Sequence, residues 1–212
     1  MPDFAIQVVP VTPFGQNCSI AWSQATRRGV VVDPGGDLDL IREAIKTAGV
    51  TIDAILLTHG HIDHAGAAAD LKDEIGVAIV GPHEADAPLL ARLEEQGRQF
   101  GLDGVRNVVP DRFLADGETI EIAGLSFDVL HCPGHSPGSV VFASSVLRFA
   151  FMGDVLFKGS VGRTDLPGGS HETLLRSIRD KVLPLGDDVS FLPGHGPGST
   201  IGEERVSNPF LR

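Results

Sequence analysis

Short apolar runs separated by turn residues open the chain, and they predict β-strands. The first three runs cover residues 4–11, 18–23 and 29–35. Runs of the same kind return in the second half and predict strands over residues 118–124, 125–132, 139–144 and 147–154. Strands are therefore expected in both halves of the chain.

Helical periodicity appears between these strands. Leu38, Ile41 and Ile45 recur at helical spacing and predict a helix over residues 37–49, with Gly49 as its stop. Further helices are predicted over residues 65–76, 87–101 and 171–186, the second with Pro88 near its first turn. Buried strands are predicted at 53–58 and 77–81, and a last strand with its loop at 188–196. Strands that meet helices in both halves predict a layered α+β or α/β architecture.

Composition narrows the classes of protein. Apolar residues make up 42% of the 212 positions, and no linker or repeat interrupts them, so residues 1–212 are expected to form one domain. The formal charge of −11 disfavours nucleic acid and membrane surfaces as partners. Neither a membrane span nor a secretory signal is found, so a cytoplasmic location is expected. Two cysteines, Cys18 and Cys132, are expected to be free thiols.

Residues 58–64, THGHIDH, place three of the eight histidines within six positions. Imidazole and carboxylate groups bind Zn²⁺, Fe or Mn²⁺. In an extended segment His59 and His61 project to one side, whereas Asp63 and His64 lie where a helix begins near Ala65. The side chains of this one short segment can then reach two positions that lie a few ångströms apart. This arrangement favours two metal ions over one.

Three more candidate ligands follow apolar strands and stand beside Gly or Pro. They are His135 in LHCPGHSPG, Asp154 in FAFMGDVLF and His195 in SFLPGHGPG. Seven donors from four loops predict a binuclear site in which one carboxylate bridges. The remaining histidines, His83, His131 and His171, are interpreted as surface or hydrogen-bonded residues, with a position behind the ligands left open for His131.

The same segments resemble the metallo-β-lactamase superfamily. THGHIDH resembles its HxHxDH motif, and CPGHS, GDVLF and PGHGP follow in the family's order after VVDPGG, its early aspartate motif. The resemblance implies a four-layer αββα sandwich with the metals at one edge of two facing sheets. It implies that the first metal is held by His59, His61 and His135, the second by Asp63, His64 and His195, with Asp154 as the bridge. Asp33 resembles the aspartate that orients a ligating imidazole.

Within the superfamily the chain most resembles a short bacterial group similar to glyoxalase II, the hydroxyacylglutathione hydrolases. The resemblance extends over PVTPFGQNCSI, GDVLFKGSVGRTDLPGG, LPLGDDVSFLPGHGP and NPFLR. It implies hydrolysis of a thioester, S-lactoylglutathione, with Asp63 and Asp154 serving catalysis as well as metal binding. Two departures concern glutathione: only 17 residues follow His195, where glyoxalase II carries a helical domain, and the chain has no tyrosine.

Two cations that share a water molecule would supply hydroxide at neutral pH. Zinc is the expected metal, with iron and manganese as alternatives, because the ligand types accept all three. Arg163 and Lys158 lie just beyond Asp154 and are candidates to bind a substrate carboxylate. The alternative for Arg163 is an ion pair with Asp165 that shapes the loop.

Other functions stay open at this point. A persulfide dioxygenase of the same superfamily would use one iron held by two histidines and a carboxylate. A lactone or β-lactam hydrolase, a nuclease and a metal-dependent interaction module are further alternatives. Residues 83–101 form either a packed helix, a cover for the site or a partner surface. Both a monomer and a small homo-oligomer are compatible with the sequence.

Overall fold

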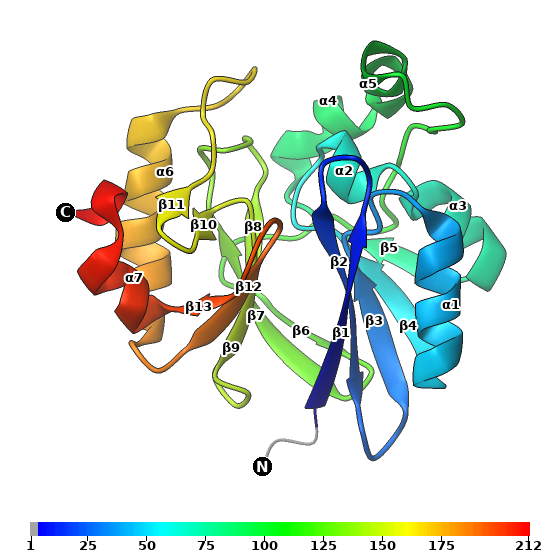
Figure 1. The fold of residues 1–212 in the computed structure, drawn as a ribbon, viewed down its shortest axis with the longest axis horizontal. Helices are drawn as coiled ribbons and strands as arrows, with labels where there is room; N and C mark the ends of the chain where they lie inside the picture. The colour runs from blue at the N-terminus through cyan, green and yellow to red at the C-terminus, as the bar shows by residue number, and fades with distance from the viewer. Residues whose placement is uncertain (1–3) are drawn as a thin grey trace.

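The computed structural model describes residues 4–212, and its strands form two main sheets (Figure 1). The first sheet has the strand order β1-β2-β3-β4-β5. Its strands are β1 (Phe4–Val11), β2 (Gln16–Ser23), β3 (Arg28–Val32), β4 (Thr51–Leu56) and β5 (Ala78–Val80). β1, β2 and β3 pair antiparallel, and β3, β4 and β5 pair parallel. All five match strands that the apolar runs predict.

The second sheet has the order β13-β12-β9-β8-β7-β6. Its strands are β6 (Thr119–Ile122), β7 (Leu125–His131), β8 (Val140–Ser144), β9 (Phe149–Gly153), β12 (Ser190–Pro193) and β13 (Ser199–Thr200). β12 runs parallel to β9, and the other pairs are antiparallel. A small separate hairpin, β10 (Leu156–Phe157) with β11 (Ser160–Val161), follows β9.

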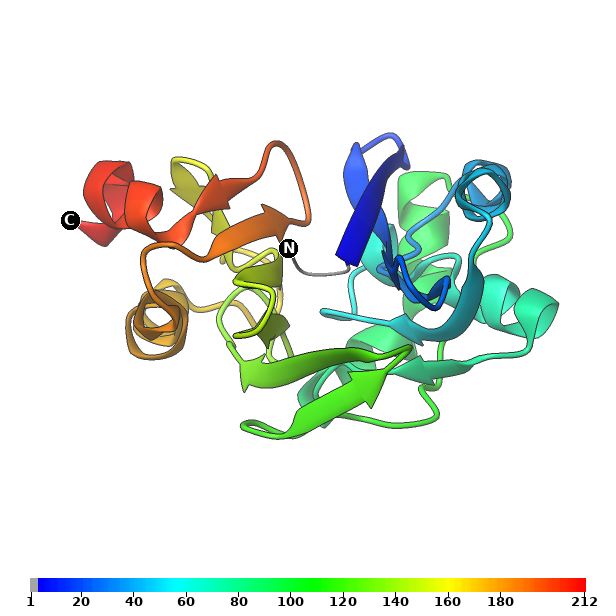
Figure 2. The ribbon, with the colours of Figure 1, turned by 90° about the horizontal axis from the view of Figure 1, so that it is seen from below.

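Three apolar clusters define four layers, helices–sheet–sheet–helices (Figures 1 and 2). Successive strand residues face opposite sides, so each sheet can bury both of its faces. In β3, Val31 packs toward the helices of the first half, whereas Val30 and Val32 pack between the sheets. In β8, Phe142 packs between the sheets and Val141 packs against the helices of the second half. The fold is therefore the expected αββα sandwich.

Helices cover the outer faces of the sheets. The first half contains α1 (Leu38–Ala48), α2 (Ile62–Ala65), α3 (Ala68–Ile75), the 3₁₀ turn η1 (Glu84–Asp86), α4 (Ala87–Leu90) and α5 (Leu93–Phe100). The second half contains α6 (His171–Ser177), the π turn η2 (Ile178–Val182), the 3₁₀ turn η3 (Leu183–Leu185), α7 (Ile201–Ser207) and η4 (Pro209–Leu211). α1 ends as expected at Gly49, whose φ of 62° lies in the left-handed region.

Three of the expected helices are broken in the structure. Residues 65–76 belong to two helices, and the first begins at Ile62 rather than near Ala65. Residues 87–101 divide into α4 and α5. Residues 171–186 pass from α6 into a π turn and then a 3₁₀ turn before the chain reaches β12, and Pro184 cannot supply the N–H that would continue an α-helix. Periodicity found the helical segments but missed these breaks.

The sequence patterns also missed the β10–β11 hairpin, β13 and α7. Each strand of the hairpin has two residues, too few to show an alternating pattern. In α7 the buried residues are Ile201 and Glu204, and a buried glutamate is invisible to a search for apolar stripes.

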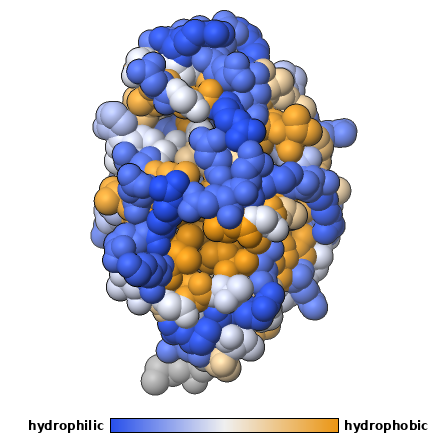
Figure 3. Space-filling view, turned by 90° about the vertical axis from the view of Figure 1, so that its right-hand side faces the viewer, coloured by the Kyte–Doolittle hydropathy of each residue, from blue (hydrophilic) through white to orange (hydrophobic). Residues whose placement is uncertain are grey.

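The outer surface over α1 and α3 is mostly hydrophilic with apolar patches between the polar side chains (Figure 3). Among residues 4–212, none of the helices has the length and apolar character that crossing a membrane requires.

Candidate metal centre

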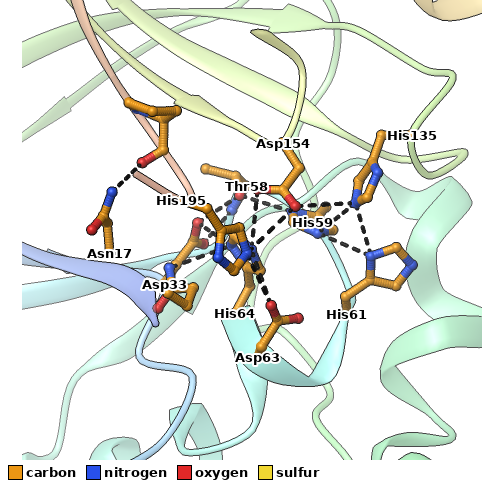
Figure 4. Close-up of polar contacts among 12 residues, drawn as sticks. Asn17, Asp33, Thr58, His59, His61, Asp63, His64, His135, Asp154 and His195 are labelled. Atoms are coloured by element: carbon orange, nitrogen blue, oxygen red, sulfur yellow. Dashed lines mark hydrogen bonds and ion pairs between the residues drawn. The ribbon is translucent and has the colours of Figure 1, made fainter. Parts of the chain in front are cut away.

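The seven side chains singled out as ligands lie together at one edge of the two sheets (Figure 4). The loop after β4 and the first turn of α2 supply four of them, and the loops after β7, β9 and β12 supply one each. They are His59, His61, Asp63, His64, His135, Asp154 and His195. The two facing sheets thus bring together residues from both halves of the chain.

The first group consists of three imidazoles that face one another. His59 Nε2 lies 3.1 Å from His61 Nδ1 and 3.2 Å from His135 Nε2, and the other two nitrogens are 2.9 Å apart. Protons cannot satisfy all three contacts, because any two nitrogens in the same protonation state repel each other. Nitrogens bound to one tetrahedral cation at about 2.0–2.1 Å lie about 3.3 Å apart. The spacing therefore fits three ligands of a single cation.

The second group contains two histidines and an aspartate. His195 Nε2 lies 3.1 Å from Asp63 Oδ2, and His64 Nε2 lies 3.8 Å from the same oxygen. Asp154 stands between the groups: its Oδ2 is 3.5 Å from His135 Nε2 and 3.6 Å from His195 Nε2. A carboxylate in this position can contact two cations at once.

Two buried polar atoms of the site also indicate that its side chains fit divalent cations. Within the described residues, His64 Nε2 and Asp154 Oδ1 are buried without a hydrogen-bond partner, although they lie 3.3 Å apart. Leaving a buried polar atom unpaired costs about 1–3 kcal/mol. A divalent cation would satisfy both atoms, and imidazole and carboxylate are its usual ligands. The donor set thus suits divalent metal ions.

Asp33 orients the imidazole of His64 directly and that of His59 through Thr58. Its Oδ2 accepts a hydrogen bond from His64 Nδ1 at 2.9 Å and from Thr58 Oγ1 at 2.6 Å. Thr58 Oγ1 in turn lies 3.1 Å from His59 Nδ1 and can accept its proton. Asp33 itself has a φ of 52°, an unfavourable backbone for a non-glycine residue that is typical of functional sites. Asp33 is the residue expected behind the imidazoles from the sequence motif, whereas Thr58 looks in the sequence like an ordinary strand-end residue and was not expected there.

Main-chain carbonyl groups hold the outer nitrogens of two other imidazoles. His135 Nδ1 lies 2.8 Å from the carbonyl oxygen of Arg163, and His195 Nδ1 lies 3.3 Å from that of Phe14. Donation from these nitrogens directs the Nε2 lone pair of each ring into the site.

Burial keeps two imidazoles of the first group, those of His59 and His61, neutral. It lowers the pKa of His59 well below the usual value. Burial, with the nearby imidazole of His135, also lowers the pKa of His61 to about 4. A neutral imidazole is the form that binds a metal ion, so these rings are ready to do so at pH 7.

The second group is charged. Burial lowers the pKa of His64, but the carboxylates led by Asp154 outweigh this effect and raise it well above the usual value. Burial raises the pKa of Asp63, but the charge of His64 and the hydrogen bond from His195 outweigh it and lower that pKa. The negative charge on the carboxylates is what attracts positive charge to this point.

A cleft of about 620 Å³ opens onto the site, and Phe14, Phe157, Lys158 and Arg163 line it. The Arg163 guanidinium makes two hydrogen bonds to Asp165, at 2.8 and 2.7 Å, as the alternative interpretation of that residue expected. Lys158 is exposed on the β10–β11 turn.

The other histidines lie outside the centre. His83 and His131 stack on each other with ring centroids 3.9 Å apart, and His131 Nε2 contacts the carbonyl oxygen of Pro137. His171 lies at the start of α6 and faces Phe210. None of the three is in a potential metal-binding group of the described residues.

An αββα sandwich with two linked His/Asp groups at the edge of its sheets is an arrangement suited to a metal-dependent enzyme. The sequence model of the Metallo-beta-lactamase superfamily matches residues 11–195. The chain therefore belongs to the metallo-β-lactamase superfamily.

Similar proteins span nearly the whole chain. A Haemophilus influenzae protein named hydroxyacylglutathione hydrolase GloC is 46% identical over 207 residues, which cover 97% of both chains. The crystal structure of BLEG-1 B3 metallo-beta-lactamase is 37% identical with a TM-score of 0.89, over 98% of this chain and 99% of that one. The structure of TTHA1623 in a di-iron-bound form is 37% identical with a TM-score of 0.87, over 97% of this chain and 100% of that one.

Proposed function

We propose that this protein hydrolyses acyl-glutathione thioesters, with S-lactoylglutathione as its substrate and a hydroxy acid and glutathione as products. The observation that carries the proposal is the pair of His/Asp groups joined by Asp154 at the floor of an open cleft. The 46% identity to the Haemophilus influenzae hydroxyacylglutathione hydrolase supports the choice of substrate. The chain acts as one domain, because both of its sheets supply residues to the centre.

His59, His61 and His135 would hold one divalent cation, and Asp63, His64 and His195 a second, with Asp154 between them. Zinc is our proposed metal, and the di-iron form of a similar protein makes iron the alternative. When bound, such cations supply a water of lowered pKa and polarise the acyl carbonyl.

Side chains of the protein would keep the groups of the centre in the orientation that the reaction needs. Asp63 carries a carboxylate that is ionised at neutral pH, and its Oδ2 lies 3.1 Å from His195 Nε2, so that its other oxygen could accept a hydrogen bond from a water molecule at the site. Asp33 keeps His64 in the tautomer whose Nε2 faces the site. The buried thiols of Cys18 and Cys132 take no part, since burial raises the pKa of both and the thiolate is the nucleophilic form.

The cleft walls suit a substrate that carries carboxylates. Lys158 is placed to attract a glutathione carboxylate, and Phe14 and Phe157 offer apolar surface to the rest of the molecule. Arg163 can contribute a second positive charge if the substrate displaces Asp165, because the ion pair between the two side chains is exposed to solvent.

The test measures thioester turnover with a panel of acyl-glutathiones and other acyl thioesters, before and after chelation and after Zn²⁺ or Fe²⁺ is added back. We expect metal-dependent cleavage of S-lactoylglutathione. His135→Ala should abolish it, whereas the matched variant His171→Ala, outside the centre, should not.

The same panel contains the competing substrates. Oxygen consumption with glutathione persulfide would indicate a dioxygenase, and cleavage of a lactone or a β-lactam without thioester turnover would indicate a different hydrolase. A β-lactam belongs in the panel because a structure that is 37% identical is named as a B3 metallo-beta-lactamase. Failure to cleave any acyl-glutathione would refute the proposed function.

A further inference from the structure

Asp86 is a buried carboxylate that the proposed chemistry does not use. It lies in η1, inside the segment 83–101, and its exposed fraction is 0%. Charged side chains are seldom fully buried unless they are paired. Burial raises the pKa of Asp86, and hydrogen bonds led by that from Ser136 act against the rise. The surroundings of this carboxylate therefore require an explanation.

The Asp86 carboxylate joins the two loops that carry the first group of imidazoles. Its Oδ2 accepts hydrogen bonds from Gly60 N and from Ser136 Oγ, both at 2.8 Å. Its Oδ1 accepts from Gly138 N at 2.6 Å. Gly60 stands between His59 and His61 in the sequence, and Ser136 directly follows His135.

Close packing leaves these loops little freedom around Asp86. A Cβ on Gly60 would lie 3.0 Å from Leu89 Cβ, and a Cβ on Gly138 would lie 2.6 Å from Asp86 N. Both loops therefore pack closely against the segment that carries Asp86, tightly at Gly60 and without room for a side chain at Gly138.

We propose that Asp86 is a positioning residue that fixes the spacing between the His59–His61 loop and the His135 loop. All three of its partners are donors, so an ionised carboxylate satisfies them and an amide cannot. The 2.9–3.2 Å spacing of the three facing nitrogens depends on the relative placement of these loops. The segment 83–101 thus supports the first group of imidazoles through the hydrogen bonds of the Asp86 carboxylate. This inference rests on the proposed metal binding.

The test is Asp86→Asn, which keeps the shape of the side chain but presents an NH₂ group to a backbone N–H. Cation affinity is measured by competition with a chromophoric chelator, using Zn²⁺, together with the absorption spectrum of the Co²⁺-loaded protein. We expect one of two cations to bind about 10- to 100-fold more weakly, as for other residues that orient metal ligands, while the second binds as in the unsubstituted protein. The Co²⁺ spectrum should change accordingly.

Glu84→Gln is the matched control, because Glu84 is exposed, carries the same charge and lies two residues away. It should bind both cations normally. Ser136→Ala removes one donor to Asp86 and should weaken the same cation several-fold, which keeps the test available if Asp86→Asn does not fold. Unchanged binding in a folded Asp86→Asn or in Ser136→Ala would overturn the proposal, and so would equal weakening of both cations. Absence of cation binding by the unsubstituted protein would instead overturn the proposed function.

Discussion

Gly194 is the position where one added methyl group would disturb the centre most directly. It precedes His195, and a Cβ built on it would lie 2.1 Å from Asp154 Oδ1 and 2.5 Å from His64 Cε1. The backbone cannot move away easily, because Gly194 N donates to Gly153 O at 2.8 Å and Gly194 O accepts from Asn17 N at 2.7 Å. Gly194→Ala must therefore displace the carboxylate between the two groups.

The size of the effect follows from these distances. Ordinary van der Waals contact with a Cβ begins at 3.4 Å, so Asp154 Oδ1 would have to shift by about 1 Å. A misplacement of about 1 Å at a catalytic centre costs about 10²-fold in rate. We expect Gly194→Ala to lower kcat for S-lactoylglutathione about 100-fold and to reduce the number of bound cations.

The assay combines thioester turnover with metal analysis of the purified variant. Gly76→Ala is the matched control, since its Cβ meets nothing within 4 Å and Gly76 lies at the end of α3. That change strains a left-handed backbone and should cost about 1–2 kcal/mol of stability, with no loss of metal. A Gly194→Ala protein with both cations and normal kcat would refute the geometry described for the centre.

Three further predictions concern the surroundings of the site. Thr58→Val removes the hydroxyl between Asp33 and His59, and competition with a chelator should show about 10- to 100-fold weaker metal binding; unchanged affinity would show that the hydroxyl orients nothing. Burial raises the pKa of both thiols, that of Cys132 to about 12, which lowers the thiolate fraction at any given pH. Iodoacetamide at pH 8 should thus label the thiols slowly in the native protein and rapidly in urea, as followed by mass spectrometry, and fast native labelling would contradict the burial. Lys158→Ala should raise KM for S-lactoylglutathione about 1.4- to 5-fold with kcat unchanged, because an exposed ion pair is worth about 0.2–1 kcal/mol. An unchanged KM would remove Lys158 from the substrate site.

The strands and the ligand candidates could be predicted from the sequence for local reasons. Alternation and apolar runs locate β1 to β9, because side chains on a strand alternate between its faces. The spacing in THGHIDH identifies four possible ligands, since one strand end and the helix after it carry them. The motifs around His135, Asp154 and His195 each contain their own donor beside Gly or Pro.

Helix breaks and very short elements could not be predicted in the same way. α2 and α3 are separated where Gly66 packs against Gly35 O, a close approach between segments 31 residues apart in sequence. α7 is held by Glu204, whose carboxylate accepts from Gly159 N on the β10–β11 turn. Neither contact changes the local pattern of apolar and polar residues from which helices are predicted.

By itself the sequence determined the strand pattern and the set of candidate donors, because each of these depends on neighbouring residues, whereas the αββα expectation came from the resemblance to the metallo-β-lactamase superfamily. The tertiary structure alone decided which atoms face one another, and it placed Thr58 beside His59 and Asp86 beside the loops that carry His59, His61 and His135. Both look ordinary in the sequence, a threonine at a strand end and an acidic residue before a helix. Their partners lie 25 and 50 residues away in Asp33 and Ser136, and only the packing of the loops brings them together.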